Sequence, residues 1–483
     1  MASCSSKKRV FVYRRRRPDK TALYKVLQEN LNTFYAEVQE ASDGFSLPTY
    51  VRSEFDAYMR CGLLQFGFSR LACADADCAY EHIVAYSCKC RGVCGSCIAR
   101  RMSQTGDHLI DHVMPAVPYR QWTISYPKML RAQLSHHPRL WSAVTTAALN
   151  KLFAWQKRQA RKAGIENPLT GSVTFLQRFG SILQLSPHAH AWLPDGVFYR
   201  KDNGALAFHV LPAPKTDDVE RLLAQVIKKT LTLAGKDTEE PEDEQAVLAH
   251  LQTEAVQAKL RASGPIIGPD LSAFCEGFSL HAGLSVHKKE RKKLKKLLRY
   301  GMRPPFAQKR LSYTSPDDDV VLKLRKPFYT GETEVRFSPT EFISRLAAII
   351  APPYQNLVRY HGIFSNHHAQ RALLQTLLPH KPPIKAPTPQ VGDDEPQAEP
   401  IPEPFRPTWA QLLKSVFDLD MLVCPRCQGK MRLVASLTKP SSIATYLSAI
   451  GENPDPPALA PARAPPQLTF DEFDPANVDA DDC

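Results

Sequence analysis

The segment "SPHAHAWLPDGVFY", Ser186 to Tyr199, decides the fold and chemistry expected for this 483-residue chain. Its apolar run and the following Pro-Asp-Gly predict a strand that ends at a turn. Side chains alternate across a strand, so His188 and His190 should share one face while Ala189 lies on the other. Neutral imidazoles bind first-row metal ions, so the pair predicts a metal site, although His-x-His also occurs often by chance.

A second element is the basic segment "HKKERKKLKKLLRYGMRPP", residues 287–305. Its pattern predicts a helix that ends near Tyr300-Gly301, before the two prolines. Leucines form its buried stripe and cations are expected around the phenol: Leu294, Leu297, Leu298, Lys292, Lys295, Lys296 and Arg299. A phenol with an ordinary pKa of about 10 can attack a phosphodiester when positive charge favours the phenolate. The alternative is a solvated basic face with an ordinary tyrosine.

The surrounding sequence predicts an α+β fold. The stretches "SVTFLQRFGSILQL" and "GALAFHVLPAP" read as short strands, with turns at Asp195-Gly196 and Asn203-Gly204. Two helical patterns, 217–234 and 242–262, follow as an excursion from the sheet. Alternation returns in "RLSYTSPDDDVVLKLRK" and "GETEVRFSP", and "TEFISRLAAII" predicts a capped helix.

Charge points to a polyanionic partner. The chain has 62 Lys and Arg against 49 Asp and Glu, a formal net charge of +13, and strongly basic segments near its start and around residue 293. No segment offers the roughly 18 uninterrupted apolar residues of a membrane helix, and the start lacks the apolar core of a secretory signal. We therefore expect an intracellular, cytoplasmic protein with no membrane partner.

The cysteines predict structural zinc rather than disulfides. Two short pairs, Cys73-x4-Cys78 and Cys94-x2-Cys97, approach the zinc-ribbon template and are the predicted ligands. Cys88 and Cys90 are substitutes or surplus thiols, and His82 is a weaker substitute. The pair Cys424 and Cys427 cannot fill a tetrahedral site alone, so it either finds two further ligands or binds no metal. Such a zinc domain would present four basic residues to DNA: Lys89, Arg91, Arg100 and Arg101.

Several blocks together resemble one family. The segments "FLQRFGSILQLSPHAHAWLPDGVFY", "HAGLSVHKKERKKLKKLLRYGMRPPFAQKRL", "NLVRYHG" and "CPRCQGKMRLVA" occur in one order. With "FSRLACADADCAYEHIVAYSCKCRGVCGSCIARRM" and "PYRQWTISYP" upstream, they resemble rolling-circle transposases of the IS91 family, including the related ISCR elements. The resemblance spans about residues 50–450.

This resemblance implies an HUH-type single-strand endonuclease, in which an antiparallel sheet carries the histidine pair and a nearby helix carries the tyrosine. His188 and His190 would then bind Mg²⁺ or Mn²⁺, and Tyr300 would be the nucleophile. The implied partners are single-stranded and hairpin DNA at element ends and target DNA, in a prokaryotic, nucleoid-associated setting. Further DNA contacts are expected from the basic arm and the tyrosine helix: Arg14, Arg15, Arg16, Arg17, Lys296 and Arg299.

One departure from the founding members concerns the nucleophile. They carry two tyrosines four residues apart, whereas Lys296 stands four before Tyr300, so the chain resembles a single-tyrosine branch. Rejoining would then need a freed 3′ hydroxyl, a second subunit of a homodimer, or Tyr300 again. Tyr360 is the runner-up nucleophile. A third metal ligand is not readable; Gln177, Gln184 and Asp195 lie near the histidines in sequence.

These signals divide the chain into eight segments. They are a basic arm with a helix (1–48), a zinc-binding domain (49–105), a helical connector (106–165), an HUH catalytic domain (166–350) with a helical insertion (215–265), a helical extension (351–378), a Pro-rich linker (379–406), a C-terminal CxxC module (407–450) and a disordered acidic tail (451–483). Two other functions stay open: a non-catalytic zinc-dependent nucleic-acid-binding protein, such as an inactive transposase copy, and a replication initiator or relaxase.

Overall fold

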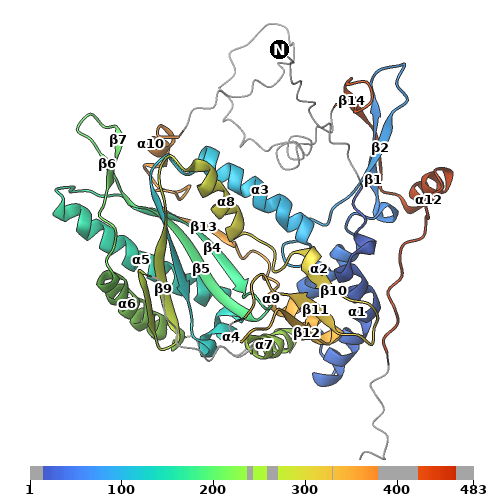
Figure 1. The fold of residues 1–483 in the computed structure, drawn as a ribbon, viewed down its shortest axis with the longest axis horizontal. Helices are drawn as coiled ribbons and strands as arrows, with labels where there is room; N and C mark the ends of the chain where they lie inside the picture. The colour runs from blue at the N-terminus through green and yellow to red at the C-terminus, as the bar shows by residue number, and fades with distance from the viewer. Residues whose placement is uncertain (1–14, 237–242, 258–269, 329, 379–422, 464–483) are drawn as a thin grey trace, which may run out of the picture.

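The computed structural model describes residues 15–236, 243–257, 270–328, 330–378 and 423–463, and has an α+β fold (Figure 1). Its centre is a six-stranded antiparallel sheet in the order β13-β4-β5-β3-β9-β8. The strands are β3 (Tyr119–Ser125), β4 (Gly171–Phe179), β5 (Leu185–Pro194), β8 (Ser272–Cys275), β9 (Phe278–Val286) and β13 (Val358–Gly362).

The histidine strand β5 lies between β4 and β3, where both of its edges are paired. Its residues alternate as predicted. Ala189, Ala191 and Leu193 are fully buried and belong to one apolar cluster, whereas Trp192 belongs to another cluster on the opposite face. His188 and His190 therefore share the Trp192 face of the sheet.

Helices cover both faces of the sheet (Figure 1). The alanine face of β5 packs in one cluster with α4 (Lys128–His136), α5 (Pro138–Lys162) and α6 (Thr216–Ala234). The histidine face packs with α3 (Gly95–His112) and α8 (Arg291–Gly301), which lie side by side in the view. Leu294 and Leu298 of α8 are 1% exposed, so the predicted leucine stripe holds the tyrosine helix on the sheet.

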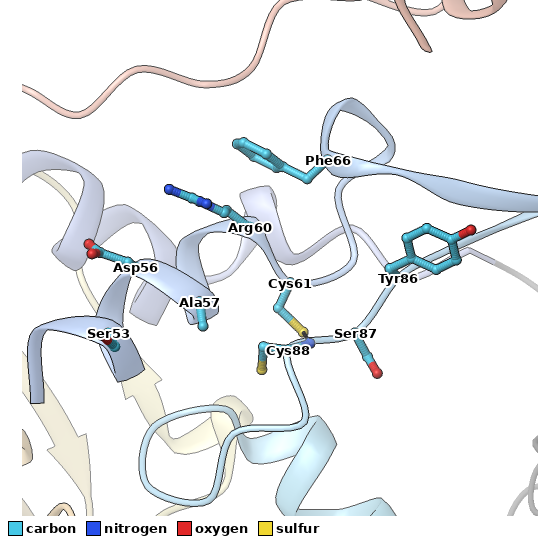
Figure 2. Close-up of a pocket in the computed structure, with 9 residues that line it drawn as sticks. All are labelled: Ser53, Asp56, Ala57, Arg60, Cys61, Phe66, Tyr86, Ser87 and Cys88. Carbon is cyan, nitrogen blue, oxygen red and sulfur yellow. Dashed lines mark hydrogen bonds between the residues drawn. The ribbon is translucent and has the colours of Figure 1, made fainter. Parts of the chain in front are cut away.

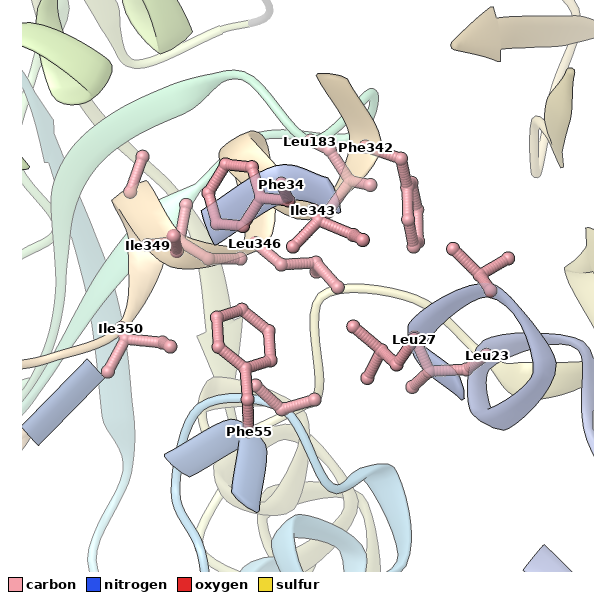
Figure 3. Close-up of a cluster of buried hydrophobic side chains, with 14 of the residues drawn as sticks. Leu23, Leu27, Phe34, Phe55, Leu183, Phe342, Ile343, Leu346, Ile349 and Ile350 are labelled. Atoms are coloured by element: carbon pink, nitrogen blue, oxygen red, sulfur yellow. The ribbon is translucent and has the colours of Figure 1, made fainter. Parts of the chain in front are cut away.

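A second body of helices joins the N-terminal part to the sheet. It consists of α1 (Ala22–Ala41), α2 (Thr49–Arg60), α7 (Asp243–Val256) and α9 (Pro339–Ile349), and Figure 3 shows how its side chains converge. Leu27 of α1, Phe55 of α2 and Leu346 of α9 are all 2% exposed or less. Leu183, from the turn between β4 and β5, enters the same cluster and links it to the histidine strand.

The remaining elements form three small units. A sheet of β10 (Leu311–Ser312), β11 (Val320–Lys323) and β12 (Glu334–Phe337) packs beside α1 and α9. The hairpin of β6 (Gly196–Arg200) and β7 (Leu206–Val210) turns at Gly204, whose φ of +82° suits glycine. The third unit joins β1 (Phe68–Cys73), β2 (Glu81–Ala85), β14 (Met431–Leu437) and α12 (Pro440–Ala449). Short helical segments elsewhere in the chain complete the described elements: η1 (Pro18–Lys20), η2 (Leu64–Phe66), η3 (Gln308–Arg310) and α10 (Arg371–Gln375).

Several segments differ from the sequence-based expectation. The segment 106–165, predicted as a helical connector, contains β3, a central strand whose alternating residues were masked by the helices on either side. The segment 351–378, predicted as a helical extension, contains the edge strand β13. Strands β10, β11 and β12, between residues 311 and 337, form their own sheet rather than extending the main one. The helices predicted as an excursion pack closely: α6 covers the sheet and α7 joins the α9 cluster.

The start of the predicted disordered tail is also ordered. Residues 451–463 follow α1, where the Ala460 N–H donates to the Gln28 carbonyl at 2.8 Å and Arg463 donates to Asn30 and Pro316. The predicted linker 379–406 lies outside the described residues. Among the described residues, no helix combines the length and apolar character that crossing a bilayer requires.

Candidate active site and zinc sites

The two predicted metal ligands lie together on β5. The rings of His188 and His190 have centroids 4.8 Å apart and an interplanar angle of 81°. His188 Nδ1 lies 2.7 Å from the Ser186 carbonyl, which makes this nitrogen the N–H donor and leaves Nε2 free to bind a metal. His190 Nδ1 lies 3.1 Å from Thr123 Oγ1 on the neighbouring strand β3. The contacts to Ser186 and Thr123 thus fix the orientation of both rings.

Their environment keeps both rings neutral. Burial lowers the pKa of His188 to about 4, with a smaller contribution from the nearby positive charge of Arg303. Burial also lowers the pKa of His190 to about 3, assisted by His188 and Arg303. A neutral imidazole is the ligand form, so the pair is ready to bind a metal at neutral pH.

Gln177 joins this strand to the tyrosine helix. It lies on β4 directly opposite His188 and therefore shares the face of the pair. Its amide Nε2 donates to the carbonyls of Tyr300 at 3.4 Å and Gly301 at 2.8 Å, which are at the end of α8. Gly301 packs so closely on the ring of Phe175 that an added Cβ would lie 2.8 Å from it. Glycine here lets the helix end reach the sheet beside the histidines.

The same glutamine suits a third-ligand role. Its Oε1 is buried and has no hydrogen-bond partner within the described part of the chain, and an orphaned buried acceptor is costly. The other two residues near the histidines in sequence lie elsewhere: Gln184 Oε1 accepts from the Ile182 N–H in the β4–β5 turn, and Asp195 forms a bidentate pair with Arg120 at 2.8 Å. Of the three, Gln177 is the one that lies opposite His188 and keeps a buried acceptor without a partner among the described residues.

Arginines surround Tyr300, but they are not the predicted ones. The phenolic oxygen accepts from Arg325 Nη1 at 2.6 Å, and the guanidinium carbons of Arg303 and Arg325 lie 5.1 and 5.5 Å from the ring centroid. Lys295 and Arg299, predicted to flank the phenol, instead pair with Asp107 of α3 at 2.7 and 2.8 Å. Arg325 follows β11 and carried no sequence signal that tied it to Tyr300.

Two cavities meet at Arg303. One, of about 440 Å³, is lined by Tyr300 and four cations and has no acidic residue in its lining: Arg303, Arg310, Arg325 and Lys326 are the cations. The other, of about 300 Å³, is lined by Gln177, Arg303, Tyr360 and the zinc-domain residues Arg91 and Arg101. Arg303 lines both cavities and its charge helps to lower the pKa of both histidines, so cationic residues lie on either side of this arginine.

The first cysteine site groups Cys61, Cys88, Cys94 and Cys97. Their Sγ atoms lie 3.6 Å (Cys61 and Cys94), 3.8 Å (Cys61 and Cys97) and 3.5 Å (Cys88 and Cys97) apart. A tetrahedral zinc ion with Zn–S bonds of about 2.3 Å requires S···S edges of about 3.8 Å, so the donors fit zinc. The Cys88 N–H donates to Cys61 Sγ at 3.3 Å, and the Arg16 guanidinium lies 3.8 Å from Cys94 Sγ, which offsets thiolate charge.

The second site joins two distant parts of the chain. Cys73 lies 3.4 Å from Cys427 and Cys78 lies 3.8 Å from Cys424, measured between Sγ atoms, and the four form one group. Burial raises the pKa of the Cys424 thiol, but hydrogen bonds from the backbone of Cys427 and Arg426 outweigh it and lower the pKa to about 7. Strand β14 pairs along β1 from Phe68 to Cys73, which holds the two halves in register.

The predicted grouping of zinc ligands is therefore wrong in one respect. Cys73 and Cys78 do not share a site with Cys94 and Cys97, because each pair completes its tetrahedron elsewhere. Cys61 was missed, and Cys88 joins the first group, which is the substitute role that the sequence had left open for it. Cys90 lies outside both groups and approaches the Glu54 carbonyl at 3.9 Å.

The predicted DNA-contacting cations differ in their surroundings. Arg14 lies outside the described residues. Arg15 pairs with Glu452, Arg17 with Asp19, and Arg91 donates to the carbonyls of Pro352 and Gln355. Arg16 lies 3.8 Å from Cys94 Sγ at the first cysteine site. Arg101 donates to the Lys89 carbonyl, and Arg299 pairs with Asp107. The remaining three are partly or fully exposed: Lys89, Arg100 and Lys296.

The histidine pair should make folding stability depend on pH. Both histidines have folded-state pKa values below the ordinary 6.5. As pH falls from about 6.5 to about 4, they therefore become protonated in the unfolded chain but stay neutral in the folded chain. The free energy of unfolding should fall over that window. Without added divalent ions, a His188→Gln/His190→Gln variant should lose less stability than the parent between about pH 7 and pH 5 in urea unfolding. His287→Gln, at an exposed position, should follow the parent; equal slopes for all three would contradict the assignment.

Zinc content tests the two cysteine sites. The intact chain should bind two zinc ions, and Cys427→Ser should retain about one, measured by elemental analysis of purified protein. Cys61→Ser should also lose about one ion. Cys275→Ser, at an exposed cysteine outside both groups, should keep both. A parent that binds a single zinc would show that the two groups are not independent sites.

Comparison with known families identifies the chain. Residues 30–126 match the family model Zn_Tnp_IS91, described as "Transposase zinc-binding domain", and residues 171–371 match Y2_Tnp, described as "Putative transposase". Together the two matches cover more than half of the chain. No curated protein and no solved structure shows a significant match. The first match contains six of the eight clustered cysteines and the second contains the histidine pair and Tyr300, so the chain belongs to the IS91 family of DNA-cleaving transposases.

Proposed function

We propose that this transposase is an HUH-type enzyme that cleaves and rejoins single-stranded DNA through a covalent bond between Tyr300 and a 5′ phosphate. The observation that carries the proposal is the contact between Gln177 and the C-terminal end of the tyrosine helix α8. That one side chain lies opposite His188 and holds the backbone of Tyr300 and Gly301. The backbone of the candidate nucleophile is thereby held beside the strand that carries the candidate metal ligands.

We expect a divalent cation, Mg²⁺ or Mn²⁺, at this site, and the two imidazole donors favour Mn²⁺ of the two. His188 and His190 would supply imidazole nitrogens and Gln177 an amide oxygen, which leaves positions for water and a phosphate oxygen. A bound ion would polarise the scissile phosphate. The protein's own contribution is to orient the two rings through Ser186 and Thr123 and to keep them neutral by burial.

The cleavage step is a transfer between esters. The phenolic oxygen of Tyr300 forms a bond to phosphorus as its proton departs, the bond from phosphorus to the 3′ oxygen breaks, and that oxygen takes up a proton and leaves as a 3′ hydroxyl. Arg325, which donates to the phenolic oxygen at 2.6 Å, provides positive charge where the oxygen becomes negative. Arg303 is near the Tyr300 ring and its charge also acts on His188, so it can hold the phosphate.

The phosphotyrosine conserves the energy of the broken ester, so attack by a 3′ hydroxyl reverses the step and joins a new strand. This supports rolling-circle transposition, with single-stranded or hairpin DNA at the element ends as substrate and a target strand as acceptor. One tyrosine on α8 leaves three sources for the second attack: a freed 3′ hydroxyl, a second subunit, or Tyr300 again. Lys296, one turn before Tyr300 and exposed, is available for a phosphate.

Tyr360 is the competing nucleophile. It lies on the edge strand β13 opposite Val173 and lines the cavity beside Arg303. Burial raises the pKa of Tyr360, which disfavours the phenolate, although nearby Arg371 opposes the shift. Tyr300 is more exposed and has a charged donor on its oxygen, so the geometry favours it.

The nucleophile is tested with Tyr300→Phe. Incubated with Mn²⁺ and end-labelled single-stranded DNA from an element terminus, the parent should form a protein–DNA adduct that survives denaturing electrophoresis. Tyr300→Phe should reduce the adduct by at least about a hundredfold, because it deletes only the attacking oxygen. Tyr360→Phe is the matched control and should retain it. Adduct formation by Tyr300→Phe but not by Tyr360→Phe would transfer the role to Tyr360.

The metal ligands are tested by separating cleavage from binding. His188→Ala should abolish the adduct while the affinity for the same DNA changes by less than about twofold, since DNA affinity rests mainly on contacts to phosphates elsewhere. Gln177→Leu should raise the Mn²⁺ concentration needed for half-maximal cleavage. If His188→Ala cleaves normally, the protein is not an HUH enzyme. A parent that binds DNA but never forms an adduct would be an inactive transposase copy; cleavage restricted to plasmid origins would indicate a replication initiator or relaxase.

A further inference from the structure

A cavity of about 410 Å³ lies on the N-terminal side of the first cysteine site and has no part in the chemistry above (Figure 2). Its walls come from α2, from the turn before β1 and from the segment after β2. They carry a mixture of aromatic, cationic, acidic and hydroxyl groups: Ser53, Asp56, Ala57, Arg60, Phe66, Tyr86 and Ser87, with Cys61 and Cys88 beneath.

The helical wall is the solvent face of α2. Ser53, Asp56 and Arg60 are exposed and recur at a spacing of three and four residues, which places them on one face. The opposite face, with Phe55 and Tyr58, is fully buried in the helix cluster. The wall is therefore fixed by core packing and presents its polar groups outward.

Two aromatic rings face the cavity. Phe66 is 38% exposed, unusual for a phenylalanine, and the Arg60 guanidinium carbon lies 5.7 Å from its ring centroid. Gly67, at φ +112°, adopts a backbone conformation that few other residues allow, and an added Cβ would lie 2.8 Å from the ring of Tyr86. Phe66 and Tyr86 both line the cavity, from different sides. In Figure 2 both rings lie on the side away from the sulfur atoms.

We infer that this cavity holds an unpaired nucleobase of a DNA strand. Aromatic rings can stack on the face of any base, so this contact does not depend on the DNA sequence. An adjacent arginine can form an ion pair with the phosphate of the same nucleotide. Asp56 and the two serines offer acceptors for the N–H groups at a base edge, which are free only when the base is unpaired.

The neighbouring surface extends the same site. A second cavity of about 410 Å³ shares Ser53 and Asp56 with the first and continues along α2 toward Tyr35. The hydroxyl of Tyr35 is buried and has no hydrogen-bond partner among the residues that the structure describes. A strand whose base stacks on Phe66 could follow this groove with its next nucleotide.

The test measures DNA affinity in the full-length, zinc-loaded chain carrying Tyr300→Phe, so that cleavage cannot alter the substrate. Binding of a fluorescein-labelled single-stranded oligonucleotide is followed by fluorescence anisotropy. Adding Phe66→Ala should weaken binding about tenfold, the effect of losing one stacked base, whereas Phe66→Trp should preserve it. Phe45→Ala is the matched control, because Phe45 is 47% exposed yet lines neither cavity.

Affinity for a duplex without single-stranded ends should be the same for all four proteins. Unchanged single-strand affinity in Phe66→Ala would overturn the inference, as would an equal loss for single-stranded and duplex DNA. Equal zinc content in Phe66→Ala and its parent shows that the domain is intact. The result is independent of the Tyr300 chemistry: loss of the adduct assay leaves this binding measurement unaffected, and unchanged binding leaves the adduct unaffected.

Discussion

The contact on which the candidate active site depends is the pair of hydrogen bonds from the Gln177 amide to the last carbonyls of α8. Helix ends leave carbonyls without partners inside the helix, and here a buried strand residue satisfies them. The cost of leaving buried polar groups unsatisfied favours one position of the helix end. The position of Tyr300 is therefore set by the sheet that carries the histidines and not by a loop.

A second constraint comes from the zinc-binding part. All ligands of its first cysteine site come from residues 61–97. Its second site also needs Cys424 and Cys427, which follow the central sheet in the sequence. The shared cluster of α1, α2 and α9 and the arginine contacts of Arg91 tie this part to the sheet domain. Arg91 and Arg101 line a cavity together with Gln177 and Arg303, so the zinc-binding part also contributes to the candidate active site.

Local patterns in the sequence were enough to predict some of this and not the rest. The two-residue period around His188 and the leucine stripe of α8 predicted the strand, its faces and the tyrosine helix, because those signals are short-range. Strand β3 was missed because it is only seven residues long and lies between helices, so its alternation of buried and exposed residues was too short to recognise. Three features depend on contacts between residues far apart in the sequence, and local spacing cannot predict them. They are the hydrogen bond from Arg325 to Tyr300, the hydrogen bonds from Gln177 to the end of α8, and the grouping of Cys424 and Cys427 with Cys73 and Cys78.

The pairing of β14 with β1 has a consequence for biosynthesis. A ribosome makes Cys73 and Cys78 some 350 residues before the thiols that complete their tetrahedron, and closing so long a loop is entropically costly. During translation the early pair is therefore half a binding site, open to other metals or thiols. The three-stranded ribbon can therefore form only after β14 has been synthesised, which makes it one of the last parts of the chain to fold.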